Sequence, residues 1–171
     1  MPEWAASTVR RLARSDDTNV NWPITHCEPS VAKYYHEDGS PRMPLQWCHG
    51  APGIASSLCG FPVGFDLELD ALLLAAGETV WHAGPLQKSA GLCHGTAGNG
   101  FTFLKLHRRT NDTRWLERAR TFAMHAIDQM RRERTAFGRP HFSLWTGDIG
   151  IALFLHACIT GDDRICCLDT A

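Results

Sequence analysis

Cysteine followed by histidine and glycine occurs twice in the chain, at residues 48–50 and 93–95. Thiolate and imidazole are groups that zinc prefers as ligands. Each copy stands just before an apolar segment that is predicted to begin a helix, and a helix N-terminus favours the thiolate over the thiol. The two tripeptides therefore supply four candidate zinc ligands, which are Cys48, His49, Cys93 and His94.

Two copies of the tripeptide favour a metal site more strongly than one copy would. A single Cys or His in the turn before a helix is more often a packed or hydrogen-bonded residue than a ligand. A catalytic zinc site has three protein ligands and an open position, whereas a structural site is closed by four. The two cysteines lie 45 residues apart, unlike the closely spaced ligand pairs of a zinc finger. The fold must therefore bring the two turns together.

Three turns of the form Gly-x-x-Gly organise the chain, and each precedes an apolar segment. Their first glycines, Gly50, Gly95 and Gly147, lie 45 and 52 residues apart, a spacing typical of repeated helical pairs. The apolar segments 101–106 and 151–159 have no polar face, which indicates helices enclosed by other helices. The helix after the first turn is expected to be short, because glycine and proline follow it closely.

Two further segments are amphipathic and are expected to form outer helices. Their apolar residues recur at helical spacing; they are Leu69, Leu72, Leu73, Ala76 and Val80 in the first segment, and Trp115, Ala119, Phe122, Ala123, Ala126, Ile127 and Met130 in the second. Asn111 and Asp112 are placed to cap the second helix. The pattern predicts an all-α fold in which inner and outer helices alternate, with loops at 16–46, 84–94 and 134–146.

The composition excludes several classes of partner. The 171 residues fit one domain, and 17 Lys and Arg against 18 Asp and Glu leave no basic excess for nucleic acid or an anionic membrane surface. No segment has the length and apolar character of a membrane span, and the N-terminus lacks the apolar segment of a secretory signal. The seven cysteines are an odd number, which favours metal or thiol chemistry in the cytoplasm over disulfides.

The three turns resemble a known family. The segments WCHGAPG from Trp47, GLCHGTAGN from Gly91 and FSLWTGDIG from Phe142 are similar to three successive motifs of lanthionine synthetase C-like (LanC-like) proteins. The resemblance implies a partial α/α toroid of inner and outer helices. Residues 1–171 would be the C-terminal portion of that domain, with a variable, loop-rich lead-in at 1–46 and zinc-binding helical hairpin repeats at 47–160.

The resemblance also selects among the four candidate ligands. It implies that Zn²⁺ is bound by Cys48, Cys93 and His94. The family member that acts on nisin has a tyrosine where this chain has His49, so His49 is expected beside the metal, where it would contact substrate. Lys88 resembles a lysine that contacts glutathione in the family's animal members; the alternative is a solvated loop lysine.

The family's reaction is the Michael addition of a zinc-bound thiolate to dehydroalanine or dehydrobutyrine, which gives a thioether. The implied partners are a dehydrated peptide or glutathione, together with a lanthipeptide dehydratase. LanC-like proteins are longer and carry an earlier His-Gly motif that residues 1–46 lack, so the chain is expected to be an N-terminally truncated form. A non-catalytic zinc- or glutathione-binding module and an inactive gene fragment are the alternatives, and no residue is assigned as the proton donor.

The remaining reactive residues are expected to have structural roles. Asp148 is interpreted as a helix cap; because it has no evident partner carboxylate, an α/α-barrel glycosidase is disfavoured. Arg134 and Arg139 are interpreted as loop residues with a possible substrate contact. Tail, loop, packing or surface positions are expected for Cys27, Cys59, Cys166, Cys167, His26, His36, His107, His125 and His156.

Overall fold

Helices make up the body of the protein, which confirms the predicted all-α class. The computed structural model describes residues 2–16, 18–24, 35–165 and 168–169. Within them the helices are α1 (Pro2–Leu12), α2 (Ala51–Leu58), α3 (Leu67–Ala83), α4 (Thr96–Thr110), α5 (Thr113–Phe137) and α6 (Asp148–Thr160). Strands β1 (Arg14–Ser15) and β2 (Val20–Asn21) form a short antiparallel pair.

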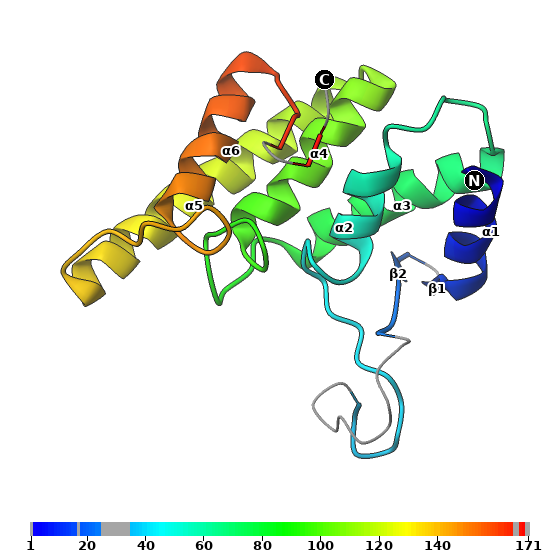
Figure 1. Ribbon diagram of the computed structural model, residues 1–171, viewed down its shortest axis with the longest axis horizontal. Helices are drawn as coiled ribbons and strands as arrows, with labels where there is room; N and C mark the ends of the chain where they lie inside the picture. Colours follow the sequence, from blue (N-terminus) through cyan, green and yellow to red (C-terminus); the bar gives the residue numbers. More distant parts are fainter. Residues whose placement is uncertain (1, 17, 25–34, 166–167, 170–171) are drawn as a thin grey trace.

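Helix α4 is the centre of the arrangement (Figure 1). It contacts α2 and α6 on its two sides, while α3 and α5 pack against it as the predicted outer helices. Every residue from Thr96 to Leu106 is buried, so the expectation of an enclosed helix is correct here. No helix in the described part of the chain combines the length and the apolar character that crossing a bilayer requires. The ring-like form implied by the family resemblance stays a prediction.

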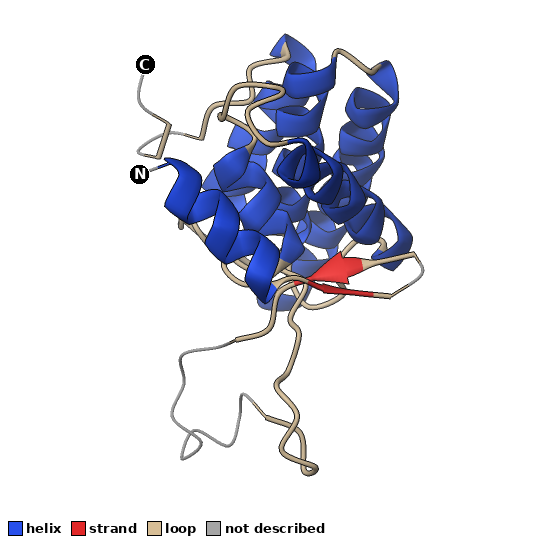
Figure 2. Cartoon of the chain, turned by 90° about the vertical axis from the view of Figure 1, so that its right-hand side faces the viewer, coloured by secondary structure: helices blue, strands red, loops and turns tan. Residues whose placement is uncertain are grey.

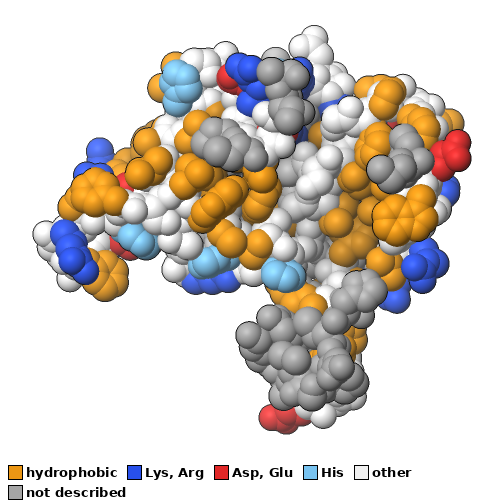
Figure 3. Space-filling model, in the orientation of Figure 1, with side chains coloured by type: hydrophobic (Ala, Val, Ile, Leu, Met, Phe, Trp, Pro, Cys, Tyr) orange, Lys and Arg blue, Asp and Glu red, His pale blue; other side chains and the backbone are white. Residues whose placement is uncertain are grey.

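The other long apolar helix, α6, is less enclosed than its composition predicts. Ile151 and Phe154 are buried against α4 and α5, but Ile149 is 51% exposed and Ile159 is 79% exposed. Figure 3 shows hydrophobic side chains on this side of the molecule. The difference has a simple cause, because among the described elements no helix follows α6 to cover its outer side.

Both outer helices of the repeats begin at an aspartate. The Asp66 side chain accepts hydrogen bonds from Glu68 N and Leu69 N at the start of α3, and the Asp112 side chain accepts from Arg114 N at the start of α5. Asn111 was expected to help cap α5, but it ends α4 instead, in the left-handed conformation at φ 56°.

The predicted loop at 134–146 begins later than expected, because α5 continues to Phe137. Residues 131–136 are mainly good helix formers, and Gly138, at φ 67°, is the first residue suited to end the helix. The loop before α4 was predicted at 84–94, and it ends one residue later, because α4 begins at Thr96.

Part of the predicted loop-rich lead-in at 1–46 forms a helix and a short strand pair. Helix α1 and strand β2 both contact α3. Figure 2 shows the strand pair near the end of the N-terminal helix. Trp22 Nε1 donates to Val9 O at 2.8 Å, and Val20 N donates to Thr79 Oγ1 at 2.8 Å. His36 lies in an exposed part of the following segment. His26 and Cys27 lie outside the described residues.

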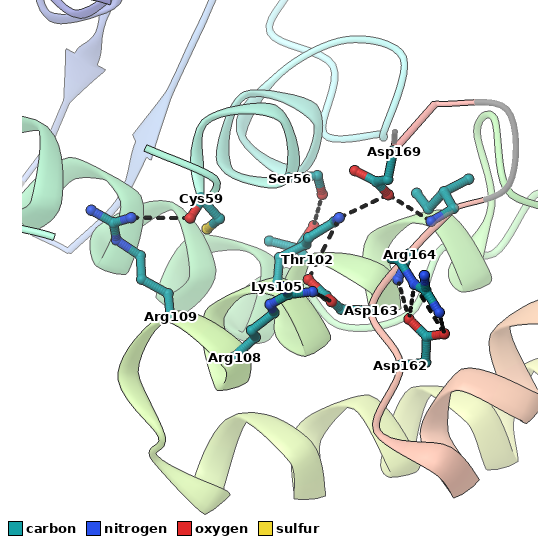
Figure 4. A network of polar contacts seen from close by, with 11 residues as sticks. Ser56, Cys59, Thr102, Lys105, Arg108, Arg109, Asp162, Asp163, Arg164 and Asp169 are labelled. Atoms are coloured by element: carbon teal, nitrogen blue, oxygen red, sulfur yellow. Dashed lines mark hydrogen bonds and ion pairs between the residues drawn. The ribbon is translucent and has the colours of Figure 1, made fainter. Parts of the chain in front are cut away.

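A polar network joins the far ends of the inner helices to the chain that follows α6 (Figure 4). Lys105 Nζ lies 2.8 Å from Asp169 Oδ2 and 3.5 Å from Asp163 Oδ2, and its side chain is only 10% exposed. Asp163 and Asp169, which follow α6, thus return to α4 through charge pairing. Cys166 and Cys167, which the sequence analysis assigned to a loose tail, lie outside the described residues.

Arg109 joins the segment after α2 to helix α3, and its replacement is expected to lower the stability of the protein. Its guanidinium donates to Cys59 O at 3.0 Å and to Phe61 O, and it pairs with Asp70; the side chain is 4% exposed. The Arg109→Met variant leaves these acceptors unpaired, so we expect the free energy of unfolding to fall by about 3–5 kcal/mol in urea denaturation.

Arg108 supplies the matched control, because it is the next residue and carries the same side chain. It pairs with Asp163 while 66% exposed, and the buried Asp163 keeps Lys105 as a partner, so Arg108→Met is expected to cost less, about 1–2 kcal/mol. Equal losses for the two variants would contradict the role given to Arg109.

Candidate metal centre

Main-chain hydrogen bonds join the three Gly-x-x-Gly turns side by side. Cys48 N–H donates to Cys93 O at 3.0 Å, and Cys93 N–H donates to Trp145 O at 2.8 Å. Trp145 occupies in the third turn the place that cysteine occupies in the other two, two residues before the first glycine. Its ring stacks on Trp47, with centroids 5.9 Å apart and planes at 23°. The repeated turns therefore bring Cys48 and Cys93, which are 45 residues apart in the sequence, into direct contact.

Close packing against the turns fixes where each inner helix begins. A Cβ added at Gly53 would lie 2.0 Å from Trp47 O, and one added at Gly98 would lie 1.8 Å from Leu92 O. Gly150 has the same relation to Leu144 O, at 2.0 Å. In each repeat the second glycine thus contacts the carbonyl oxygen of the residue six positions earlier. This contact packs the Gly-x-x-Gly turn against the N-terminal end of the inner helix.

Three of the four candidate ligands form one group. One ligand atom from each of Cys48, Cys93 and His94 lies within 4.8 Å of the other two, and all three residues are half-buried. Two sulfurs bound tetrahedrally to one zinc ion would lie about 3.8 Å apart, so small side-chain movements suffice to place an ion between them. The Cys-Cys-His group could hold a metal ion; that the ion is zinc stays a prediction.

The surroundings of the Cys48 thiol also suit a cation. Burial raises the pKa of the Cys48 thiol, and the adjacent Cys93 raises it further, while a hydrogen bond from Gln46 lowers it. Two thiolates at this separation repel each other unless a positive charge lies between them. A divalent ion supplies that charge and replaces the thiol protons, so the donor set fits zinc.

His49 and Lys88 lie at the rim of the group. The His49 ring is exposed, and its Nδ1 is 3.3 Å from Cys48 Sγ, yet His49 is not one of the three clustered residues. Lys88 is exposed on the loop before α4, and its Nζ donates to Gln46 Oε1. Substrate contacts by His49 and Lys88 stay predictions.

Sequence reasoning missed Gln46. Its Nε2 donates to Cys48 Sγ at 3.3 Å, while its Oε1 accepts from Lys88. Its place two residues before Cys48 is the only signal that the sequence offers, and proximity along the chain does not distinguish a functional glutamine from a solvated one.

The interpretation of Asp148 as a cap is wrong. The N-cap of α6 is Gly147, and no side chain caps that helix. The Asp148 carboxylate instead accepts from Arg134 Nε at 2.9 Å and from His141 N at 3.3 Å, which ties the end of α5 to the third turn. Arg134 is therefore at the end of α5 and ion-paired. Arg139 lines, with these residues, a cleft of about 610 Å³.

The other described cysteines and histidines have structural surroundings. Burial raises the pKa of the Cys59 thiol to about 12, and burial likewise raises that of Cys158 to about 12, so both stay protonated. His107 Nδ1 lies 3.0 Å from Asp112 O. His125 is half-buried and His156 is exposed, each on a helix.

Comparison with known proteins decides the family. The sequence model described as Lanthionine synthetase C-like protein matches residues 3–168. The chain belongs to the LanC-like family. The family resemblance of the three turns is thereby confirmed, and the match also includes the N-terminal helix and hairpin.

Two LanC-like relatives are similar over part of the chain. LanC-like protein GCL1 of Arabidopsis thaliana is 42% identical over 100 residues, which are 57% of this chain and 23% of the plant protein. Glutathione S-transferase LANCL1 of Danio rerio is 41% identical over 115 residues, which are 65% of this chain and 27% of the zebrafish protein. The matched parts span about a quarter of the length of these curated LanC-like relatives.

Proposed function

We propose that this chain binds Zn²⁺ through Cys48, Cys93 and His94 and activates a thiol for Michael addition to dehydroalanine or dehydrobutyrine. The observation that supports the proposal is a Cys-Cys-His group in a chain of the LanC-like family. The product is a thioether, either a lanthionine-type bridge in a peptide or an adduct of glutathione.

The bond changes balance without an oxidant or a reductant. The thiol gives up its proton, its sulfur bonds to the β-carbon, and the electrons of the C=C bond move to the α-carbon and its carbonyl. A proton then adds to the α-carbon, so the sum is addition of S–H across the double bond. Zinc, when bound, lowers the pKa of the thiol, and a general acid must deliver the second proton.

Residues of the chain have distinct parts in this proposal. The Cys48 and Cys93 thiolates offset the charge of the ion, and His94 completes a three-ligand set with one open position. Lys88 and His49 contact the substrate, with the Lys88 ammonium pairing with a carboxylate of the incoming thiol. The exposure of both side chains beside the group supports this part of the proposal.

Two kinds of substrate are consistent with the family. The name of the zebrafish relative, a glutathione S-transferase, supports glutathione as the thiol. The family description supports a dehydrated peptide, which requires a lanthipeptide dehydratase because serine or threonine must first lose water. Cys48, Cys59, Cys93 and Cys158 are free, which supports a reducing compartment such as the cytoplasm.

The second candidate is zinc or glutathione binding without catalysis. The observation in its favour is that residues 1–46 contain no His-Gly pair, so the proton for the α-carbon has no assigned donor in this chain. In this case Lys88 and the metal group retain a thiol without adding it to anything.

Metal analysis and turnover separate these functions. The purified chain is expected to hold about one zinc ion and, with glutathione and a dehydroalanine peptide, to form a product whose mass is the sum of the two. Chelator-treated protein is the control. Zinc binding without turnover favours the second candidate, whereas a chain that holds no zinc even after refolding with the metal contradicts the first candidate and the zinc-binding form of the second.

A further inference from the structure

Gln46 has a partner at each end of its side-chain amide. Its Nε2 donates to Cys48 Sγ at 3.3 Å, and its Oε1 accepts from Lys88 Nζ. Cys48 belongs to the metal group, while Lys88 is an exposed residue of the loop between α3 and α4. One half-buried amide thus connects a candidate metal ligand to the cation at the rim.

The two partners fix the orientation of the Gln46 amide. The amide nitrogen only donates hydrogen bonds and the amide oxygen only accepts them. If the amide were turned over, Oε1 would face the Cys48 sulfur and Nε2 would face the Lys88 ammonium, and both contacts would become unfavourable. In the observed orientation they support each other, because an ammonium at Oε1 polarises the amide and makes Nε2 a stronger donor.

The support at Cys48 comes from two side chains of its own turn. Its sulfur lies 3.3 Å from Gln46 Nε2 and 3.3 Å from His49 Nδ1. A donor beside a ligating sulfur disperses its negative charge, and groups that hydrogen-bond to ligands commonly change metal affinity by about 10–100-fold. When His49 Nδ1 carries the ring proton, His49 also donates to this sulfur, so loss of Gln46 alone is expected to reduce zinc affinity by an amount near the lower limit of that range.

We infer that Gln46 is a positioning residue of the thiol-addition site, an inference that rests on the proposed function. Through Nε2 it stabilises Cys48 as a thiolate ligand. Through Oε1 it holds the Lys88 ammonium beside the metal group, so a thiol that carries a carboxylate meets Lys88 while its sulfur reaches the metal. Gln46 therefore links metal affinity to the preference for anionic thiols.

The turn that contains Gln46 allows the side chain to be tested alone. Gln46 N–H donates to His49 O at 3.0 Å, and His49 N–H donates to Gln46 O at 2.9 Å. These bonds use main-chain atoms, so they persist when the side chain is replaced. Gln46→Leu removes both amide contacts, whereas Gln46→Glu, which has nearly the same shape, keeps an acceptor for Lys88 and loses the donor to Cys48.

The first measurements follow the metal in the full chain. Competition with a chromophoric chelator is expected to show zinc bound about 10-fold more weakly by Gln46→Leu, and at least as weakly by Gln46→Glu, whose carboxylate faces the thiolate. With Co²⁺ as the probe, the thiolate-to-cobalt absorption band is expected at longer wavelength in both variants, because a sulfur without its donor gives up charge more readily.

A second measurement follows the substrate. In the addition to a dehydroalanine peptide, Gln46→Leu is expected to raise KM for glutathione by up to about fivefold, the range of an exposed ion pair. KM for cysteamine, which has no carboxylate, is expected to change less. Gln87→Leu is the matched control, since Gln87 is exposed on the same loop as Lys88. This variant should have the zinc affinity, the cobalt absorption band and the KM for glutathione of the parent chain.

The outcomes separate this inference from the proposed function. If the parent chain binds neither Zn²⁺ nor Co²⁺, both are wrong. If the parent chain binds the metal and the folded Gln46→Glu variant matches it in zinc affinity and in the cobalt band, the inference is overturned and the proposed metal site stands. Circular dichroism establishes that each variant is folded.

Discussion

Zinc binding is expected to be lost in the Cys93→Ala variant, with an affinity at least about 100-fold below that of the parent chain. Groups that only hydrogen-bond to ligands already change affinity by about 10–100-fold, and this variant removes one of two thiolates from a three-residue group. The main-chain bonds of residue 93 to Cys48 and Trp145 do not use the side chain, so the turns remain joined. Zinc affinity by chelator competition measures the effect.

Cys158→Ala is the matched control for this prediction. It removes the same atom from a buried thiol on α6, which is not part of the metal group, so zinc affinity should not change. Cys48→Ala and His94→Ala should behave like Cys93→Ala. If Cys93→Ala kept the affinity of the parent chain while remaining helical, the proposed ligand set would be wrong.

A methyl group at Gly98 is expected to destabilise the protein by about 3 kcal/mol or more, the upper part of the range for overpacked interiors. The Cβ of Gly98→Ala would lie 1.8 Å from Leu92 O and 2.9 Å from Trp47 Cβ. The nearest of these atoms is main chain, so no side-chain rotation relieves the overlap and α4 must move away from the turn. The midpoint of urea unfolding measures the loss.

The same movement should reach the metal group, because the displaced turn carries Cys93 and His94. Gly98→Ala is therefore expected to weaken zinc binding as well as stability. Gly60→Ala is the control, since a Cβ there has no atom within 4 Å and stability should be unchanged or raised by up to about 1 kcal/mol. Equal stability of the two variants would show that the close contact at Gly98 is tolerated.

The sequence predicted the repeated helices well and their boundaries less well. The α4 segment was recognisable because it is apolar on all sides and follows a Gly-x-x-Gly turn, and α5 because Asp112 precedes a long amphipathic run. Helix α1 was not predicted, since its short inner face, with Ala6 buried and Val9 partly buried, offers few repeats of the helical period. The exposure of α6 depends on what packs beside it, which its own residues do not specify.

The candidate site was predictable in its residues but not in its contacts. Two copies of Cys-His-Gly pointed to Cys48, Cys93 and His94, although the family resemblance was needed to separate them from His49. The pairing of Asp148 with Arg134 could not be foreseen, because it depends on where α5 ends relative to the third turn. Gln46 could not be foreseen either, since its contact with Lys88 joins residues 42 positions apart.

The hydrogen bonds that join the three turns use only main-chain atoms, and this has a consequence for how such a protein can vary over evolutionary time. The register of the turns places Cys48, Cys93 and Trp145 at equivalent positions while making no demand on their side chains. The same pattern of main-chain hydrogen bonds therefore includes a thiol at two of these positions and an indole at the third. Because the backbone contacts do not depend on the ligand side chains, we expect one repeat to be able to lose or acquire a ligand while its neighbours keep theirs.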